Sequence, residues 1–140
     1  HGDREDIVIR IPCENILELK ELVPTGNYIP VSGTDLDLRK LRSIKDFYVD
    51  NAFWPKKQDD TAEMIFRAIN VAMTISTSKE FQHMIVYAPK GKPFICVENL
   101  TTAPNAQNLI TKGKGDVASL LVVPPSKTVC GEIFYEIKNI

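Results

Sequence analysis

Short apolar segments separated by turn-forming residues are the feature of this sequence that most restricts its fold. In the first of them (DIVIRIP), Ile7, Ile9 and Ile11 alternate with other side chains, and such alternation places the three on one face of a β-strand. Similar segments recur to the end of the chain, where Ile133 and Tyr135 alternate in the same way. Many short strands between turns predict an all-β protein, an antiparallel β-sandwich, with strands in residues 6–12, 15–19, 27–31, 46–50, 83–89, 93–98, 118–125 and 131–137.

The stretch from residue 61 to residue 77 (TAEMIFRAINVAMTIST) is compatible with two structures. Ile65 and Ile69 lie at helical spacing, whereas the alternation on either side of Asn70 fits two strands. Because the neighbouring segments are β, we predict two strands with a break near Asn70.

Turn signals and doubly apolar stretches refine this expectation. Pro24, Thr25 and Gly26 predict a turn in which Gly26 takes a positive φ. Gly91 lies near the tip of a short loop between two apolar segments, which predicts a hairpin. Two stretches are apolar on both faces and are expected inside the sandwich: residues 85–87 and 120–123.

The size and charge of the chain favour one domain with a small, uncharged ligand. The 140 residues suffice for a single core, and no linker divides them, so residues 1–140 are expected to form one domain. The 17 basic and 18 acidic residues give a net charge of −1, which argues against a nucleic-acid or membrane surface as partner. No apolar run of about 18 residues and no leader pattern is found, so we expect a cytoplasmic protein. The chain begins with His1 rather than Met, which indicates a trimmed chain or a piece of a longer protein.

The three cysteines, Cys13, Cys96 and Cys130, are widely spaced and set among apolar residues. An odd number without a C-x-x-C pair predicts reduced thiols in the core rather than disulfides. The same spacing argues against a zinc site, so no metal is expected.

Glu98 is the first candidate for chemistry because it ends an apolar strand. The stretch FICVENLTTAPNAQN places Phe94, Cys96 and Glu98 on one strand face, so the acid follows two apolar neighbours that we expect to be buried. A carboxylate there must reach water, a hydrogen-bond partner or a cleft. The Thr, Asn and Gln residues that follow could hydrogen-bond a polyhydroxy ligand. The alternative is a strand-end glutamate that simply reaches water.

Asp50 is the second candidate because it lies among the aromatic residues Tyr48, Phe53 and Trp54. Sugar sites combine carboxylates, which accept hydroxyl protons, with an aromatic ring against the apolar face of the sugar. The alternative is an Asx-type turn whose aromatic neighbours are anchored in the core.

Other ionisable residues give weaker signals. His83 begins a strand and could act as an acid or base, but a lone histidine there is expected at the surface or at a sheet edge. Asp35 and Asp37 precede Arg39, which predicts a turn with local salt bridges rather than a calcium site. His1 is terminal and is expected to be disordered.

Three stretches together resemble the aldose 1-epimerase, or galactose mutarotase, family. VPTGNYIPVSGTDLDLRKLRSI is similar to a family segment of the form P-T-G-x-x-x-P-V-x-G-T-x-x-D-hydrophobic-R. DFYVDNAF is similar to the next segment, in which an aspartate precedes an aromatic residue, and FICVENLTTAPNAQNL is similar to the segment that carries the catalytic glutamate. LLVVPPSKT then resembles a late strand and its Pro-rich turn. The resemblance covers nearly the whole chain but only the C-terminal half of the family, and the common order and spacing of the stretches carry it.

This resemblance implies part of a large antiparallel β-supersandwich that interconverts the α and β anomers of a free hexose without a cofactor. It implies that Glu98 is the general base for the anomeric hydroxyl and that Asp50 hydrogen-bonds sugar hydroxyls. The family's acid histidine and substrate-binding arginine lie in the N-terminal half, which this chain does not resemble, and His83 matches no catalytic position. Asn99 follows the glutamate where the family usually has Pro, and Ser126 stands where its late turn usually has Gly.

The missing acid leaves three functions open. The first is an aldose 1-epimerase completed by an N-terminal half, and the second is a non-catalytic sugar-binding or scaffold protein. The third is a hexose-6-phosphate 1-epimerase, in which lysines would meet the phosphate: Lys90, Lys92, Lys112 and Lys114. A sandwich that lacks half of its strands exposes strand edges and an apolar face, so we also expect an N-terminal half chain or a further copy of this chain as partner.

Overall fold

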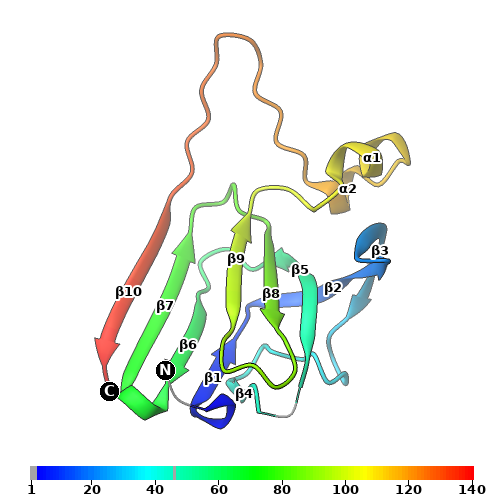
Figure 1. Ribbon diagram of the computed structural model, residues 1–140. Coiled ribbons are helices and arrows are strands. Elements are labelled where there is room, and N and C mark those ends of the chain that lie inside the picture. The colour runs from blue at the N-terminus through cyan, green and yellow to red at the C-terminus, as the bar shows by residue number, and fades with distance from the viewer. Residues whose placement is uncertain (1–2, 46) are drawn as a thin grey trace.

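The structure, a computed structural model, describes residues 3–45 and 47–140 as two packed antiparallel sheets of five strands each (Figure 1). His1 and its expected disorder lie outside the described residues. The strands are β1 (Ile7–Arg10), β2 (Cys13–Lys20), β3 (Val23–Pro30), β4 (Arg42–Ser43), β5 (Val49–Lys56), β6 (Ala62–Phe66), β7 (Val71–Thr77), β8 (His83–Ala88), β9 (Cys96–Leu100) and β10 (Ile133–Asn139). Sheet A has the order β10-β7-β6-β1-β4, and sheet B has the order β3-β2-β5-β8-β9. The expected antiparallel β-sandwich is therefore confirmed.

The main core lies between the two sheets. The alternating Ile7, Ile9 and Ile11 are all buried there, as predicted, and sheet B contributes Phe53 and Met84. Burial of each such side chain stabilises the fold by roughly 1.5–3 kcal/mol. The inner face of sheet B is thus fixed by packing, and its other face remains for the second apolar cluster and for the candidate site.

Two short helices, α1 (Ala106–Thr111) and α2 (Gly115–Ala118), pack on the outer face of sheet B and are called the cap. Leu109 of α1 and Val117 of α2 are buried against Leu17 and Ala52 of the sheet. Figure 1 shows the cap near β3, at one end of sheet B. The cap was not expected from the sequence, because its segment is polar and contains two glycines.

The remaining helical elements are two single 3-10 turns, η1 (Arg4–Asp6) and η2 (Arg67–Ile69). η2 joins β6 to β7, and Asn70 after it has a φ of 52°, so the predicted pair of strands with a break near Asn70 is confirmed. No helix in the described part of the chain is long and apolar enough to cross a membrane.

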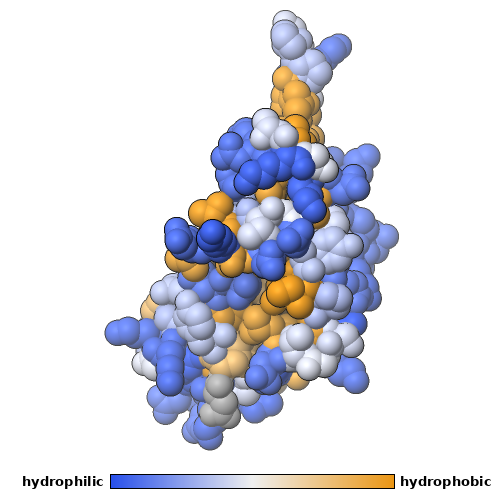
Figure 2. All heavy atoms as spheres, turned by 90° about the vertical axis from the view of Figure 1, so that its right-hand side faces the viewer, coloured by the Kyte–Doolittle hydropathy of each residue, from blue (hydrophilic) through white to orange (hydrophobic). Residues whose placement is uncertain are grey.

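The strand expected in residues 118–125 is wrong. Residues 119–132 form an extended arm without sheet pairing, and Val122 in it is 70% exposed. The arm projects beyond the sandwich in both views, with a band of hydrophobic side chains below a hydrophilic tip (Figures 1 and 2). Its β-forming residues have no neighbouring strand to pair with, so the local preference for β structure does not produce a sheet.

Two further expectations need correction. The turn expected at residues 24–26 lies inside β3, where Gly26 does take a positive φ of 92° but accompanies a register shift between β2 and β3. Ile85 and Tyr87 are only half-buried, because their face of sheet B is partly open. The hairpin that places Gly91, with a φ of 71°, between β8 and β9 is confirmed.

All three cysteines are free, in line with the expected reduced state. Cys13 is buried in the core as expected, and burial raises the pKa of its thiol to about 12. Cys96 is half-buried and Cys130 is exposed on the arm, so the expected core position is wrong for Cys130.

Candidate functional site

Asp50 and Glu98 lie on the same face of sheet B. Asp50 on β5 pairs with Tyr87 on β8, and Glu98 on β9 pairs with Ile85 on β8. Side chains alternate along a strand, so Asp50 and Glu98 share one face of the sheet with Ile85 and Tyr87. This is the outer face, because Ile85 and Ala52 belong to the apolar cluster beneath the cap. Standard strand spacings place the Cα atoms of Asp50 and Glu98 roughly 12 Å apart. A separation of this size leaves room for one six-membered ring between the two side chains.

Glu98 is exposed at the edge of sheet B. The expected burial of its two apolar neighbours is wrong, since Phe94 is 46% exposed and Cys96 is half-buried. The reason is that β9 is an edge strand whose outer face is not covered. The Cys96 thiol donates a hydrogen bond to Glu98 Oε1 at 3.3 Å. Burial, with this carboxylate as a second cause, raises the pKa of Cys96.

Asp50 is half-buried and accepts a hydrogen bond at Oδ2 from the Tyr48 hydroxyl at 3.4 Å. Desolvation, with a contribution from the Asp50 charge, raises the pKa of Tyr48. Asp50 also lines a small pocket of about 60 Å³ together with Leu22, Ile85 and Pro104. Small-molecule sites usually enclose about 300–1,000 Å³, so this face is an open surface with a shallow depression.

The architecture is shared with larger proteins. Neither a family model nor a curated protein sequence matches the chain. Among solved structures, an aldose epimerase homologue from C. elegans superposes with a TM-score of 0.77 at 18% identity, covering 99% of this chain and 47% of its own. A galactose mutarotase-like protein from Clostridium acetobutylicum gives a TM-score of 0.78 at 16% identity, covering 100% and 44%. A candidate aldose 1-epimerase from Escherichia coli K12 gives 0.77 at 14% identity, covering 99% and 47%.

The fold is that of the galactose mutarotase-like proteins. This chain spans less than half the length of the three solved structures, which fits the resemblance to a C-terminal half found in the sequence. At these identities the likeness shows the fold alone.

His83 is fully buried, so its expected place at the surface or sheet edge is wrong. Its Nε2 lies 2.9 Å from the carbonyl oxygen of Val117 in α2, and since a carbonyl can only accept, Nε2 carries the proton and donates. The imidazole stacks on Trp54 with ring centroids 6.2 Å apart. Burial lowers the pKa of His83 to about 4. His83 therefore fixes the cap to sheet B as a neutral group.

The aromatic residues near Asp50 divide between the two faces of sheet B. Phe53 points into the main core and Trp54 packs under the cap against Tyr28, with centroids 5.4 Å apart. Tyr87, which pairs with Asp50, contacts Phe94 with centroids 6.0 Å apart. Tyr87 and Phe94 thus flank the face that carries the two acids. They were not singled out from the sequence, because strand alternation alone does not show that β8 lies between β5 and β9.

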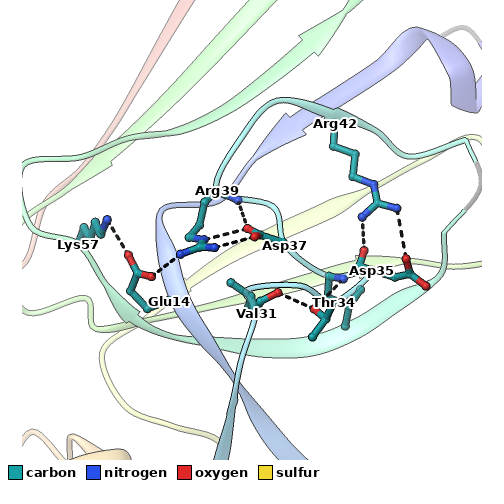
Figure 3. Close-up of polar contacts among 9 residues, drawn as sticks. Glu14, Val31, Thr34, Asp35, Asp37, Arg39, Arg42 and Lys57 are labelled. Atoms are coloured by element: carbon teal, nitrogen blue, oxygen red, sulfur yellow. Dashed lines mark hydrogen bonds and ion pairs between the residues drawn. The ribbon is translucent and has the colours of Figure 1, made fainter.

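Asp35 and Asp37 form the expected turn with local salt bridges (Figure 3). Arg39 holds Asp37 with two hydrogen bonds of 2.8 and 2.6 Å and reaches Glu14 at 2.8 Å. The hydrogen bond from Arg39 lowers the pKa of Asp37. Arg42 donates to the backbone carbonyl of Asp35. These acids are engaged by arginine side chains and stabilise the loop between β3 and β4.

Proposed function

We propose that this chain provides the general base and a hydroxyl-binding carboxylate of an aldose 1-epimerase that acts on a free hexose. The observation that carries the proposal is that Glu98 and Asp50 project from strands on either side of β8 onto one open face. The fold shared with aldose epimerase homologues supports it. The half-exposed Tyr87 lies next to both acids and offers a ring for the apolar face of a sugar.

In this mechanism Glu98 takes the proton of the anomeric hydroxyl while an acid gives a proton to the ring oxygen. The bond between the anomeric carbon and the ring oxygen breaks, and an open-chain aldehyde forms. The aldehyde group rotates, and the hydroxyl formed from the ring oxygen attacks the other face of the carbonyl carbon. The ring closes with the opposite configuration as this hydroxyl returns its proton to the acid and Glu98 returns its proton to the new anomeric oxygen. Asp50 accepts hydrogen bonds from other sugar hydroxyls and fixes the ring in place.

The acid must come from a group other than His83. That residue is the one histidine in residues 3–45 and 47–140, and it lies beneath α2 with a pKa lowered to about 4. We propose that a segment equivalent to the remaining half of the mutarotase-like structures supplies the acid and covers the open face beside Glu98.

Glu98→Gln tests the base directly. Magnetisation-transfer NMR on glucose and galactose measures exchange between the α and β anomers in the presence of the complete protein, in which this chain is joined by the segment that supplies the acid. We expect wild-type protein to accelerate the exchange and Glu98→Gln to lose about 10²- to 10⁴-fold, the usual contribution of a positioned base. Glu80→Gln, at a half-buried acid outside the candidate site, is the control and should keep full activity. Undiminished exchange with Glu98→Gln would refute the assignment.

Asp50→Asn tests the binding carboxylate. The variant keeps the shape of the side chain but removes its charge, so KM should rise roughly 10- to 100-fold with a smaller change in kcat. A fall in kcat by a similar factor, with KM unchanged, would contradict a binding role. Running the same assay with hexose 6-phosphates separates the free sugar from its phosphate ester as substrate.

A non-catalytic sugar-binding protein is the second candidate, and the open face with its shallow 60 Å³ pocket favours it. In that case saturation-transfer NMR would detect sugar binding that weakens in Asp50→Asn, while anomer exchange would stay at the rate of buffer alone.

A further inference from the structure

The edge strand β10 leaves large apolar side chains in water. It pairs with β7 over its whole length without a register shift, and within the described residues its other edge faces no strand. Four apolar side chains within eight residues are more than half exposed: Phe134 at 57%, Tyr135 at 56%, Ile137 at 67% and Ile140 at 63%. A concentrated exposed patch of this kind marks an interaction surface.

The other sheet edges are protected in ways that β10 is not. β4 has only two residues, and β3 carries two prolines and a register shift. β9 is five residues long and presents the charged Glu98. Short edge strands, prolines, irregularities and charges are the devices that prevent sheet edges from pairing with other chains. β10 has seven residues, no proline and no irregularity, so it is the edge best suited to take a further strand.

We propose that β10 pairs with β10 of a second copy of this chain, antiparallel and centred on Ile137. In this two-fold arrangement Ile137 lies opposite Ile137 of the second copy. Glu136 lies opposite Lys138 of the second copy, and Phe134 lies opposite Ile140 of the second copy. Sheet A then continues through the interface into sheet A of the other copy, and the contact is closed, as in most homodimers.

The distribution of side chains on β10 selects this register. Tyr135 and Ile137 pair with the inward-facing Ile75 and Met73, so they point to the inner face, and Glu136 and Lys138 point to the outer face. Opposite residues in an antiparallel pair share a face, so only a register centred on a residue keeps apolar side chains together. Centring on residue 136 sets Glu136 against itself, and centring on residue 138 sets Lys138 against itself. Among these three registers, only the one at Ile137 pairs opposite charges.

The charges are available for this contact. Within one chain, Lys138 and Glu136 lie 2.9 Å apart but are 63% and 60% exposed, and exposed pairs of this kind contribute little to stability. The Glu136 carboxylate can therefore turn to Lys138 of the second copy, and the Lys138 ammonium group can turn to Glu136 of the second copy. The charge complementarity of β10 with itself favours a second copy over a different protein as the occupant.

Charge exchange tests the register. The oligomeric state is measured by sedimentation velocity over a concentration series. Wild-type protein should dimerise, and Glu136→Lys or Lys138→Glu alone should weaken the dimer by about tenfold or more, because each creates two like-charge pairs. The double variant Glu136→Lys/Lys138→Glu should return the dissociation constant to within about threefold of wild type. Lys127→Glu, on the exposed arm, is the control and should change nothing.

Cross-linking tests the two-fold axis. In a Cys130→Ser background, Ile137→Cys should form a disulfide-linked homodimer on mild oxidation, because residues directly opposite have Cα atoms about 4.5–5.5 Å apart. Tyr135→Cys is the matched control, since its nearest equivalent is displaced by about 14 Å along the strands.

Three results would overturn the proposal. The first is a monomer at every concentration, and the second is a dimer whose dissociation constant changes in neither single charge variant. The third is cross-linking of Tyr135→Cys that is as efficient as that of Ile137→Cys. A monomeric chain would leave the edge of β10 to a different occupant, such as the segment that we propose to complete the sugar site. Sugar turnover is not a readout here, so the result is independent of the proposed function.

Discussion

At the scale of single residues, His83 shows how burial decides the role of an ionisable group. The same side chain in a solvated position would titrate near neutral pH. Under α2 it keeps one hydrogen bond, to Val117, and its Nδ1 has no partner in the described structure. A second proton would therefore be buried without an acceptor, which is why the folded protein keeps the imidazole neutral.

This neutrality makes stability dependent on pH. The pKa of His83 is lowered to about 4 in the folded protein. Between about pH 6.5 and pH 4, His83 is therefore protonated in the unfolded chain but neutral in the folded one. Stability should fall as the pH decreases through this window, by an amount on the order of 3 kcal/mol, and the effect should level off below it. Urea unfolding of wild type and His83→Gln at several pH values measures it, since glutamine can donate to Val117 but does not titrate. Parallel curves for the two proteins would contradict the assignment.

At the scale of elements, the cap shows why a stable local structure can have a weak sequence signal. α1 has six residues and α2 has four, too few for helix propensity to stabilise them. They persist because Leu109, Val117 and Ala118 are buried on sheet B. The cap also approaches β3 closely at Gly26, near Lys114, which lies just before α2. A Cβ atom added to Gly26 would lie 2.7 Å from Cγ of Lys114.

Leu109→Ala measures how strongly the cap is held. Leu109 is fully buried, so its truncation should cost about 2–5 kcal/mol, either in global unfolding or as detachment of the cap. Ile110→Ala, on the same helix but 43% exposed, should cost much less. Trp54 is the one tryptophan in the chain and packs against the cap cluster, so its fluorescence should shift to the red in Leu109→Ala alone. Equal effects of the two substitutions would show that the cap is not held by this contact.

The strands with clear alternation, such as residues 7–11, were predictable because one face of each is buried in the core. The break at Asn70 was predictable because alternation changes there. The face shared by Asp50 and Glu98 was not, since it depends on β8 lying between β5 and β9, and β5 and β8 are separated in sequence by a hairpin that belongs to sheet A. The arm was mistaken for a strand because four successive apolar residues favour β structure only where a partner strand exists.

At the scale of the whole molecule, the arm is the longest segment that no sheet or helix supports. It joins the cap on sheet B to the edge strand of sheet A (Figure 1). Apart from the turn in which Lys127 N–H donates to the Pro124 carbonyl at 3.1 Å, its tip makes few backbone hydrogen bonds. Exposed segments of this kind are where proteases cut folded proteins first.

Trypsin should therefore cleave first after Lys127. β10 would stay bound through its full-length ladder with β7, so the cut protein should elute as one species in native gel filtration and separate into two fragments under denaturing conditions. Mass spectrometry identifies the site, and Lys127→Gln should delay cleavage. A first cut after Lys112 or Lys114 would instead identify the cap as the least stable part.

Sheet A also has a kinetic consequence. Its ladders join Ile7 to Phe66 and Ile133 to Thr77, so more than fifty residues of chain must be closed into a loop before either ladder can form. Closing a loop of this length costs conformational entropy before the contacts that offset the cost have formed. Proteins dominated by such pairings refold in milliseconds to seconds rather than microseconds. Until the last strand reaches β7, the chain exposes a second unpaired edge, and refolding at high dilution should therefore give the greatest yield of native protein.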